Sequence, residues 1–289
     1  MKKYQLGLYE KAMPGDLTWP EKLLTAREGG YDYVEMSIDA SEEKIARVYM
    51  PAADRDLLRA MTRRTGVPIG SLNDSALTKY ALGSMNPETR QRGLEIGLMS
   101  ISLARDLGVT IVMIPGYDVY YETSTEETRR FFEENLRILV DEAARQGIIL
   151  AFETMENEFM NLIRKGMVYV NRIRSPYLQM YPDLGNMTNG ALVHGESVSE
   201  DLEAGRGHIA ALHLKETKPG IFREVPYGDG HVDFEAGVKK AWELGVRRYV
   251  TEFWYTGEEN WKEILKENGA AFNALLMKQD PSQEETEES

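Results

Sequence analysis

Short apolar runs recur along this chain at fairly regular intervals, and many of their residues are β-branched or aromatic. Runs of this kind, bounded by turn residues, are typical of strands, whereas the segments between them repeat apolar positions with the spacing of a helix. The pattern predicts eight strands. They lie at residues 4–9, 31–38, 67–72, 110–116, 148–155, 177–183, 209–216 and 247–254.

The segments between these runs predict helices, and several end on a glycine that can close a helix in the left-handed conformation. Alternating strands and helices imply parallel pairing with right-handed crossovers, and eight such units in 289 residues match the usual size of a (β/α)8 barrel. An open doubly wound sheet is the alternative. However, the first strand and the residues after it read LGLYEKAMPGD, which lacks the G-x-G-x-x-G fingerprint of that fold.

The chain is predicted to form one domain, because no linker rich in proline, glycine or serine interrupts the series. We therefore expect a single TIM-barrel domain over residues 1–279. The remaining residues, 280–289, carry five acids and no base. Such a composition cannot bury enough apolar area to order itself, so this tail is predicted to be disordered.

Composition narrows the possible partners and the compartment. Lys and Arg total 34 against 47 Asp and Glu, which gives a net charge of -13; such a surface repels phosphodiester backbones, so we expect no nucleic acid partner. The chain has no cysteine, which suits a reducing compartment. Its N-terminus lacks the apolar core of a signal peptide, and no run approaches the ~18 apolar residues of a membrane span. A cytoplasmic protein without a membrane partner is expected.

Polar residues mark the carboxyl ends of the predicted strands, where a barrel gathers its functional side chains. Glu35 ends the second strand, Asn73 and Asp74 follow the third, and Tyr117 and Asp118 follow the fourth. Each of the next four strands ends in a potential metal ligand. These residues are Glu153, Asp183, His213 and Glu252.

Side-chain alternation indicates where these ligands point. Three of them share a strand face with a small or apolar residue two positions earlier, namely Ala151, Ala211 and Val250. Such neighbours fit the inner layers of a barrel, so the ligands are expected to face its axis. Three carboxylates in one place would raise each other's pKa, and a divalent cation removes that difficulty. Three oxygens and one nitrogen suit one Zn, Mn, Mg or Co ion.

Each candidate ligand also has a purely structural interpretation. Asp183 could cap a turn or the following helix, and either glutamate could pair with an arginine at the barrel mouth. A single buried histidine is more often a hydrogen-bonded core residue, and we interpret the other three in that way: His194, His208 and His231. The coincidence of four candidates on adjacent strands favours the metal site.

Two further clusters lie near the same end of the predicted barrel. The loop at residues 213–230 holds Lys215, Lys218 and Arg223 beside several glycines, where barrels commonly bind phosphate, although a solvated basic loop would have the same composition. The stretch GYDVYY, which includes Tyr117, is aromatic enough to wall a sugar-sized pocket, but tyrosines at loop edges are also ordinary packing.

With these residues in view, the sequence resembles the L-ribulose-5-phosphate and L-xylulose-5-phosphate 3-epimerases, which are xylose-isomerase-like TIM barrels. The similarity runs from about Leu6 to the final helix. It is carried by LGLYEKAMP, YDYVEMSID, GYDVYY, ETRRFF, FMN at 159–161, YPDLGN, GHIAALHLKETKPGIF and VPYGDGHVDFE.

The resemblance implies a metal-dependent 3-epimerase of a ketose, of which a ketopentose 5-phosphate is the expected substrate. The proton on C3 would leave and return through a metal-stabilised enediolate. The family's metal ligands correspond to Glu153, Asp183, His213 and Glu252, and its acid/base pair to the two glutamates. Asn186 corresponds to a residue that orients substrate, and Asn161 could face a hydroxyl or phosphate. Relatives of this kind often form homodimers, which we expect here.

One segment departs from the family. After the third strand the family reads S-x-x-x-S-A-H-R-R-F-P-L-G-S, whereas this chain reads SLNDSALTKYALGS, with Leu77, Thr78 and Lys79 in place of His, Arg and Arg. The substrate could therefore differ in length, stereochemistry or phosphorylation, although Lys79 could partly compensate. Two alternative functions are an aldose-ketose isomerase with the same metal set and a non-catalytic sugar-phosphate binding protein.

Overall fold

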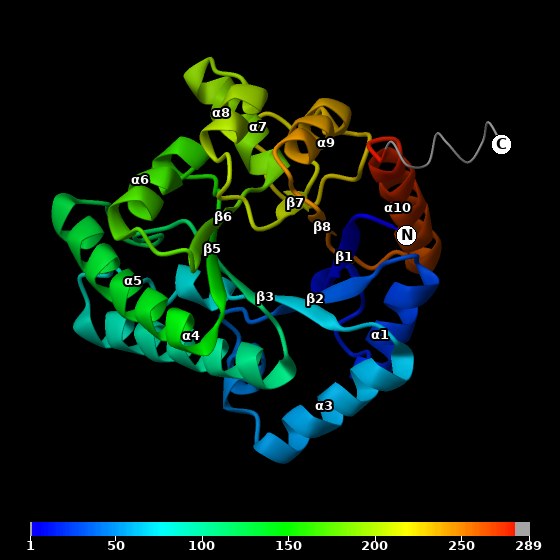
Figure 1. Ribbon diagram of the computed structural model, residues 1–289, viewed down its shortest axis with the longest axis horizontal. Coiled ribbons are helices and arrows are strands. Elements are labelled where there is room, and N and C mark those ends of the chain that lie inside the picture. Colours follow the sequence, from blue (N-terminus) through cyan, green and yellow to red (C-terminus); the bar gives the residue numbers. More distant parts are fainter. Residues whose placement is uncertain (1, 281–289) are drawn as a thin grey trace.

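The computed structural model describes residues 2–280, and in this part of the chain eight strands form one parallel sheet (Figure 1). The sheet order is β6-β5-β4-β3-β2-β1-β8-β7. Isolated parallel bridges, Met180 to Ile209 and Asp183 to His213, join its two edge strands and close a barrel, which confirms the predicted (β/α)8 fold. The strands are β1 (Gln5–Tyr9), β2 (Tyr33–Ser37), β3 (Ile69–Asn73), β4 (Ile111–Pro115), β5 (Ile149–Glu153), β6 (Leu178–Tyr181), β7 (Leu212–Leu214) and β8 (Arg248–Thr251).

Helices surround the barrel and cover the outer face of its strands (Figure 1). The α-helices are α1 (Trp19–Glu28), α2 (Glu42–Ala46), α3 (Ala52–Thr65), α4 (Pro87–Leu107), α5 (Glu126–Gln146), α6 (Ile163–Ile173), α7 (Leu184–His194), α8 (Val198–Ala204), α9 (Phe234–Glu243) and α10 (Trp261–Met277). The described residues also contain three short 3-10 helices: η1 (Glu10–Ala12), η2 (Arg47–Tyr49) and η3 (Ser75–Thr78).

Glycines end several of these helices in the left-handed conformation, which glycine adopts without steric cost. Gly66, Gly108 and Gly147 follow α3, α4 and α5 with φ of 76°, 75° and 71°. These three helix ends confirm the prediction from sequence. The seventh strand is shorter than predicted, because Ile209 contributes only an isolated bridge ahead of β7.

The barrel interior is filled by a small cluster of buried side chains, separate from the larger core between strands and helices. Its members are Tyr9, Tyr33, Ile111, Met113, Ala151, Tyr181, Ala211 and Val250. Ala151, Ala211 and Val250 are the residues whose alternation predicted the direction of the candidate ligands. Their place in the interior confirms that this face of β5, β7 and β8 points at the axis.

Tyr33 occupies the space that two glycines leave open on neighbouring strands. An added Cβ would lie 2.4 Å from the ring at Gly7 and 2.3 Å from it at Gly70. The Tyr33 hydroxyl donates to the backbone carbonyl of Tyr249 at 3.1 Å, so the ring has a fixed position. The bottom of the barrel therefore depends on glycine in β1 and β3 as much as on the aromatic residue.

The C-terminal segment is described only to Asp280. That residue, which we assigned to the predicted tail, is buried, and its carboxylate accepts a hydrogen bond from Lys3 at 2.9 Å. The rest of the predicted tail, residues 281–289, lies outside the described residues. Among residues 2–280, none of the helices combines the length and the apolar character that crossing a bilayer requires.

We expect Gly70→Ala to destabilise the protein by about 1–3 kcal/mol, because its methyl group would overlap the Tyr33 ring inside a packed barrel. Denaturant unfolding followed by circular dichroism measures the change. Gly15→Ala is the matched control, since no atom of residues 2–280 would lie within 4 Å of a Cβ there. The control should stay within about 0.5 kcal/mol of the parent. Equal stability of the two variants would show that the barrel interior is not packed as described.

Candidate metal centre and active site

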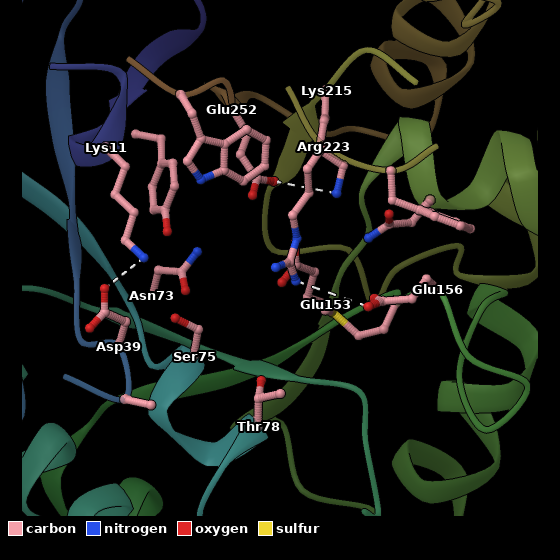
Figure 2. A pocket seen from close by; sticks show the side chains of 16 residues that line it. Lys11, Asp39, Asn73, Ser75, Thr78, Glu153, Glu156, Lys215, Arg223 and Glu252 are labelled. Atoms are coloured by element: carbon pink, nitrogen blue, oxygen red, sulfur yellow. Dashed lines mark ion pairs between the residues drawn. The ribbon is translucent and has the colours of Figure 1, made fainter. Parts of the chain in front are cut away.

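A cavity of about 190 Å³ opens at the carboxyl ends of the barrel strands (Figure 2). Glu153 and Glu252 line it, together with Asn186 and Lys215. Figure 2 shows Lys11, Asn73, Ser75 and Thr78 on one side of the opening, with Glu156 and Arg223 across from them. The cavity therefore joins a group of acidic residues to a wall of amide, hydroxyl and cationic side chains.

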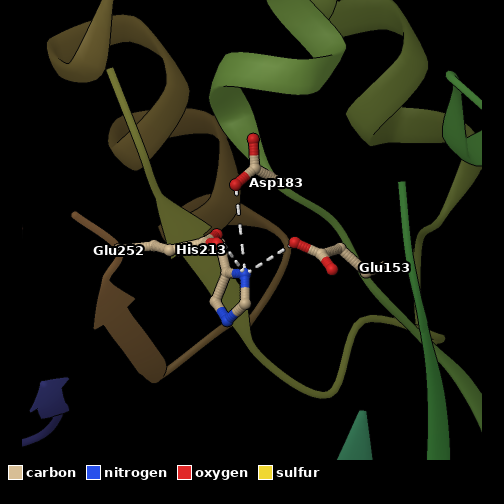
Figure 3. A group of neighbouring side chains, drawn as sticks. All are labelled: Glu153, Asp183, His213 and Glu252. Atoms are coloured by element: carbon tan, nitrogen blue, oxygen red, sulfur yellow. Dashed lines mark hydrogen bonds and ion pairs between the residues drawn. The ribbon is translucent and has the colours of Figure 1, made fainter. Parts of the chain in front are cut away.

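The four predicted ligands lie together at this end of the barrel (Figure 3). Glu153 is the last residue of β5, His213 lies in β7, Glu252 follows β8, and Asp183 follows β6 at the start of α7. Each offers one ligand atom, and these atoms all lie within 4.8 Å of one another. All four residues are buried. Residues separated by up to about a hundred positions are thus brought to one point by the closure of the barrel.

One nitrogen of His213 faces the three carboxylates. Its Nδ1 lies 3.1 Å from Glu153 Oε1, 2.9 Å from Glu252 Oε2 and 3.9 Å from Asp183 Oδ2. The other ring nitrogen, Nε2, lies 2.8 Å from Glu35 Oε1. With Nε2–H donating to Glu35, the lone pair of Nδ1 is available to a cation.

Glu35 orients this histidine, a role that the sequence did not reveal. Its carboxylate accepts hydrogen bonds from the hydroxyls of Ser71 at 2.6 Å and Tyr181 at 2.9 Å. All these groups are fully or almost fully buried, and such a carboxylate fixes the ring and raises the basicity of the nitrogen opposite. The signal available in the sequence was an acidic residue inside an apolar strand, but its partner could not be read there.

Asp183 caps a helix and also belongs to the candidate ligand cluster, which are the two roles that the sequence left open. Its Oδ1 accepts a hydrogen bond from the backbone N–H of Asn186 at 2.6 Å, which caps α7. Its Oδ2 is buried and accepts no hydrogen bond from the part of the chain that the structure describes; it lies 3.2 Å from the ammonium of Lys215. One oxygen holds the helix, and the other faces the histidine and its neighbouring carboxylates.

Burial and mutual repulsion dominate the electrostatics of the cluster. Burial, together with the charges of Glu252 and Glu153, raises the pKa of Asp183 to about 8, against the opposing effect of Lys215. Burial and the charge of Glu252 also raise the pKa of Glu153. Burial acts in the same direction on Glu252, but the positive charges of Lys215 and His213 outweigh it and lower the pKa of that carboxyl.

The donor set fits a divalent metal ion. Within residues 2–280, one buried oxygen of Asp183 and one of Glu252 accept no hydrogen bond and have only the Lys215 ammonium and His213 near them, so both could serve as ligands of a cation. Three carboxylates and one imidazole, without thiolates, suit borderline or hard divalent ions. A cation would also offset the burial and the carboxylate repulsion that raise the pKa of Asp183. The group could therefore hold one metal ion at the mouth of the barrel.

The other predicted substrate residues divide into two groups. Asn186 and Lys215 line the cavity, and the Lys215 ammonium lies within the acidic cluster. Four candidates are not among the residues that line it. Lys79 and Lys218 are exposed, Tyr117 is buried against Glu156, and the Asn161 amide oxygen accepts a hydrogen bond from Lys165.

Several lining residues were not among the predicted site residues. Lys11 follows β1, Asn73 ends β3, and Ser75 and Thr78 lie in η3, within the segment that departs from the family pattern. Of the three departing positions, only Thr78 reaches the cavity, because Leu77 is packed in the core and Lys79 faces solvent. Loop residues carry no periodicity, so their direction was not predictable.

Comparisons with known proteins show the family to which this fold belongs. A sequence model described as "xylose isomerase-like TIM barrel" matches residues 23–273. The chain is similar to L-ribulose-5-phosphate 3-epimerase UlaE of Salmonella heidelberg (strain SL476), at 39% identity over 90% of each chain. It is 41% identical to putative L-ribulose-5-phosphate 3-epimerase SgbU of Escherichia coli (strain K12), over 88% of this chain and 90% of the relative.

Solved structures share the fold at lower sequence identity. A structure of L-ribulose 3-epimerase superimposes with a TM-score of 0.76 at 16% identity and covers 98% of each chain. A D-allulose 3-epimerase from Methylomonas sp. gives a TM-score of 0.76 at 15% identity, with 96% of this chain and 99% of that one covered. At these identities the superpositions establish the architecture.

Glu35→Gln should weaken the binding of a divalent metal by about 10–100-fold, because the neutral side chain no longer supports the His213 ring as a carboxylate does. Competition titration of the metal-free protein with a chelating dye measures the change. Ser71→Ala is the companion variant, since it removes one hydrogen bond to Glu35 and keeps the charge. We expect a smaller loss for it. Unchanged metal affinity in Glu35→Gln would contradict the role given to this carboxylate.

Proposed function

This chain belongs to the xylose isomerase-like TIM barrel family, where it groups with the L-ribulose-5-phosphate 3-epimerases, and we propose that it is a metal-dependent 3-epimerase of a ketose. It is an enzyme of the isomerase class, a sugar epimerase. The main support for a metal-dependent 3-epimerase is a pair of buried glutamates, Glu153 and Glu252. They approach one imidazole nitrogen from different strands.

The two glutamates suit proton transfer on opposite faces of a substrate carbon. Figure 3 shows Glu153 and Glu252 on opposite sides of His213, and both line the cavity. One carboxylate takes the proton from C3, and the electron pair of the broken C–H bond moves into an enediolate on C2 and C3. The other glutamate, protonated, then gives a proton to C3 from the opposite face. The configuration at C3 is inverted without net gain or loss of atoms.

Glu153, Asp183, His213 and Glu252 are the proposed ligands of one divalent ion, either Zn, Mn, Mg or Co. When bound, this ion supplies Lewis-acid stabilisation of the negative charge that develops on the substrate oxygens, which is worth several kcal/mol. The protein residues position the sugar beside it. Asn186 Oδ1 and Asn73 Oδ1 are buried, make no hydrogen bond with any residue from 2 to 280, and belong to residues that line the cavity. They are suited to accept hydrogen bonds from sugar hydroxyls.

We place the phosphate of a ketopentose 5-phosphate against the wall formed by Lys11, Ser75 and Thr78. The hydroxyls of Ser75 and Thr78 make no hydrogen bond with any other described residue, so they are free to donate to a ligand. The Lys11 ammonium pairs with Asp39 at 2.6 Å and has two further N–H groups. The names of the curated relatives support a 5-phosphate as substrate.

Incubation with L-ribulose 5-phosphate in D2O, with Mn supplied, tests the reaction. The parent enzyme should form the C3 epimer and incorporate deuterium at C3, as seen by proton NMR. Glu153→Gln and Glu252→Gln should each lower turnover by about 100-fold or more, because each removes one proton-transfer group. Deuterium at C1 or C2 with aldose formation would point to an aldose-ketose isomerase. Absence of exchange at every carbon across a panel of ketoses would refute the proposal.

Lys11→Met tests whether Lys11, Ser75 and Thr78 bind the phosphate of the substrate. The ratio of kcat/KM for a ketose 5-phosphate to that for the free ketose should fall about 10–100-fold, since a hydrogen bond to a charged group contributes about 1.5–3 kcal/mol. Lys79→Met, which removes an exposed lysine outside the cavity, is the matched control and should keep the ratio. A fall in Lys79→Met instead of Lys11→Met would move the phosphate to the other lysine.

A further inference from the structure

A long loop between β7 and α9 forms part of the cavity. It covers residues 215–233, and its regular pairing is limited to a bridge between Lys218 and Ile221. Phe222 and Arg223, near the middle of this loop, line the cavity. A segment of this length has many accessible conformations, so some contact must hold the two side chains at the site.

The carboxylate of Glu216 joins the two ends of this loop. Its Oε1 accepts hydrogen bonds from the backbone N–H groups of Thr217 at 3.0 Å and Val232 at 3.1 Å. Its Oε2 accepts one from the N–H of Gly228 at 3.3 Å. At Gly230 an added Cβ would lie 2.1 Å from Glu216 Oε1, so the returning backbone packs directly on the carboxylate. One side chain thereby fastens both the start and the end of the loop.

The surroundings of Glu216 exclude a role as an ordinary ion-pair partner. The residue is 4% exposed, and within residues 2–280 no Lys, Arg or His nitrogen lies at ion-pair distance from its carboxylate. Burial of a carboxylate without a cation is costly unless hydrogen bonds compensate for the lost water. Here the compensation comes from three backbone N–H groups of one loop. The Glu216 carboxylate therefore serves to hold the conformation of that loop.

Further contacts attach the same loop to the metal-site side of the barrel. The Thr217 hydroxyl donates to the backbone carbonyl of Gly185 at 3.1 Å, in the first turn of the helix that Asp183 caps. The N–H of Gly220 donates to Asn189 Oδ1 at 2.9 Å. The anchored ends are thus fixed relative to the candidate ligands, while the middle of the loop reaches over the cavity.

The backbone beside Arg223 is itself in an unfavourable conformation. Glu224 has a φ of 58°, and non-glycine residues rarely adopt the left-handed region unless the surrounding structure imposes it. Arg223 has 60% of its side chain exposed, and its guanidinium lies 4.0 Å from Glu156, too far for a strong pair. Arg223 is thus not fixed by a strong ion pair with Glu156, so its placement depends on how the loop backbone is held on either side of it.

We propose that Glu216 is a positioning residue, which holds loop 217–232 so that Arg223 completes the substrate side of the cavity. This inference rests on the proposed epimerase function for its kinetic consequence. Glu216 does not touch the candidate metal ligands through its side chain. Replacing Glu216 should therefore raise KM for the ketose while the affinity for the metal stays unchanged.

A double-mutant cycle with Glu216→Ala and Arg223→Ala tests this role. Glu216→Ala should raise KM for the ketose about tenfold or more and change kcat much less, since small misplacements at a site can cost up to about 100-fold. If Glu216 acts through Arg223, the double variant should be no worse than Arg223→Ala within about twofold. If the KM increases of the two single variants multiply in the double variant, the proposal is overturned. An unchanged KM in Glu216→Ala would also overturn it.

Conservative and control variants separate positioning from a general loss of structure. Glu216→Gln keeps one acceptor oxygen and should recover part of the KM. Asp229→Ala, an exposed acid in the same loop, should leave KM and kcat at the parent values. Metal content and the thermal unfolding midpoint are measured for every variant. A KM defect that follows the unfolding midpoint across the series would mean that Glu216 stabilises the fold generally and would overturn the proposal.

Hydrogen exchange of the metal-loaded protein gives a readout that needs no turnover. Backbone amides at Thr217, Gly228 and Val232 should exchange at least tenfold faster in Glu216→Ala, while amides of the barrel strands keep their rates. Unchanged exchange at these three amides would refute the inference even if the enzyme is an epimerase. Faster exchange in a protein that epimerises no ketose would reject the proposed function and the kinetic part of the inference, but retain Glu216 as the residue that holds the loop.

Discussion

The structure depends on the crowding of three buried carboxylates around one nitrogen of His213. Glu153, Asp183 and Glu252 cannot all be charged at this distance without positive charge nearby. Lys215 supplies one such charge at 3.2 Å from Asp183, and the proposed cation would supply more. Chemistry at the site and stability of the barrel mouth are therefore coupled, because the same ligands end four neighbouring strands.

In several residues of the site, one atom faces the carboxylate cluster while another atom of the same side chain is held by a separate hydrogen bond. Asp183 caps a helix with one oxygen and offers the other to the cluster. His213 turns Nδ1 to the carboxylates because Glu35 holds Nε2. Both carboxylate oxygens of Glu216 accept hydrogen bonds from backbone N–H groups of the loop that carries Arg223. Orientation comes from buried polar contacts, while apolar packing supplies the rigid barrel around them.

Much of the candidate site could be predicted from sequence because barrel geometry is regular. Strands of period two fix which face each side chain occupies, so Ala151 indicated the direction of Glu153 and Ala211 that of His213. The carboxyl ends of parallel strands meet at one end of a closed barrel, which brings the four ligand candidates together once the strands are identified. The stretches shared with the 3-epimerases pointed to the same four residues.

The sequence by itself determined the strand and helix alternation, the closing glycines and the identity of the four ligand candidates, because each follows from local periodicity or from residue type at a strand end. Only the tertiary structure decided that Lys11 lines the cavity whereas Lys79 and Lys218 face solvent, and that Glu35 and Glu216 hold other groups in place. Irregular loops have no repeat from which direction can be read, and hydrogen bonds between distant segments exist only after the barrel has closed.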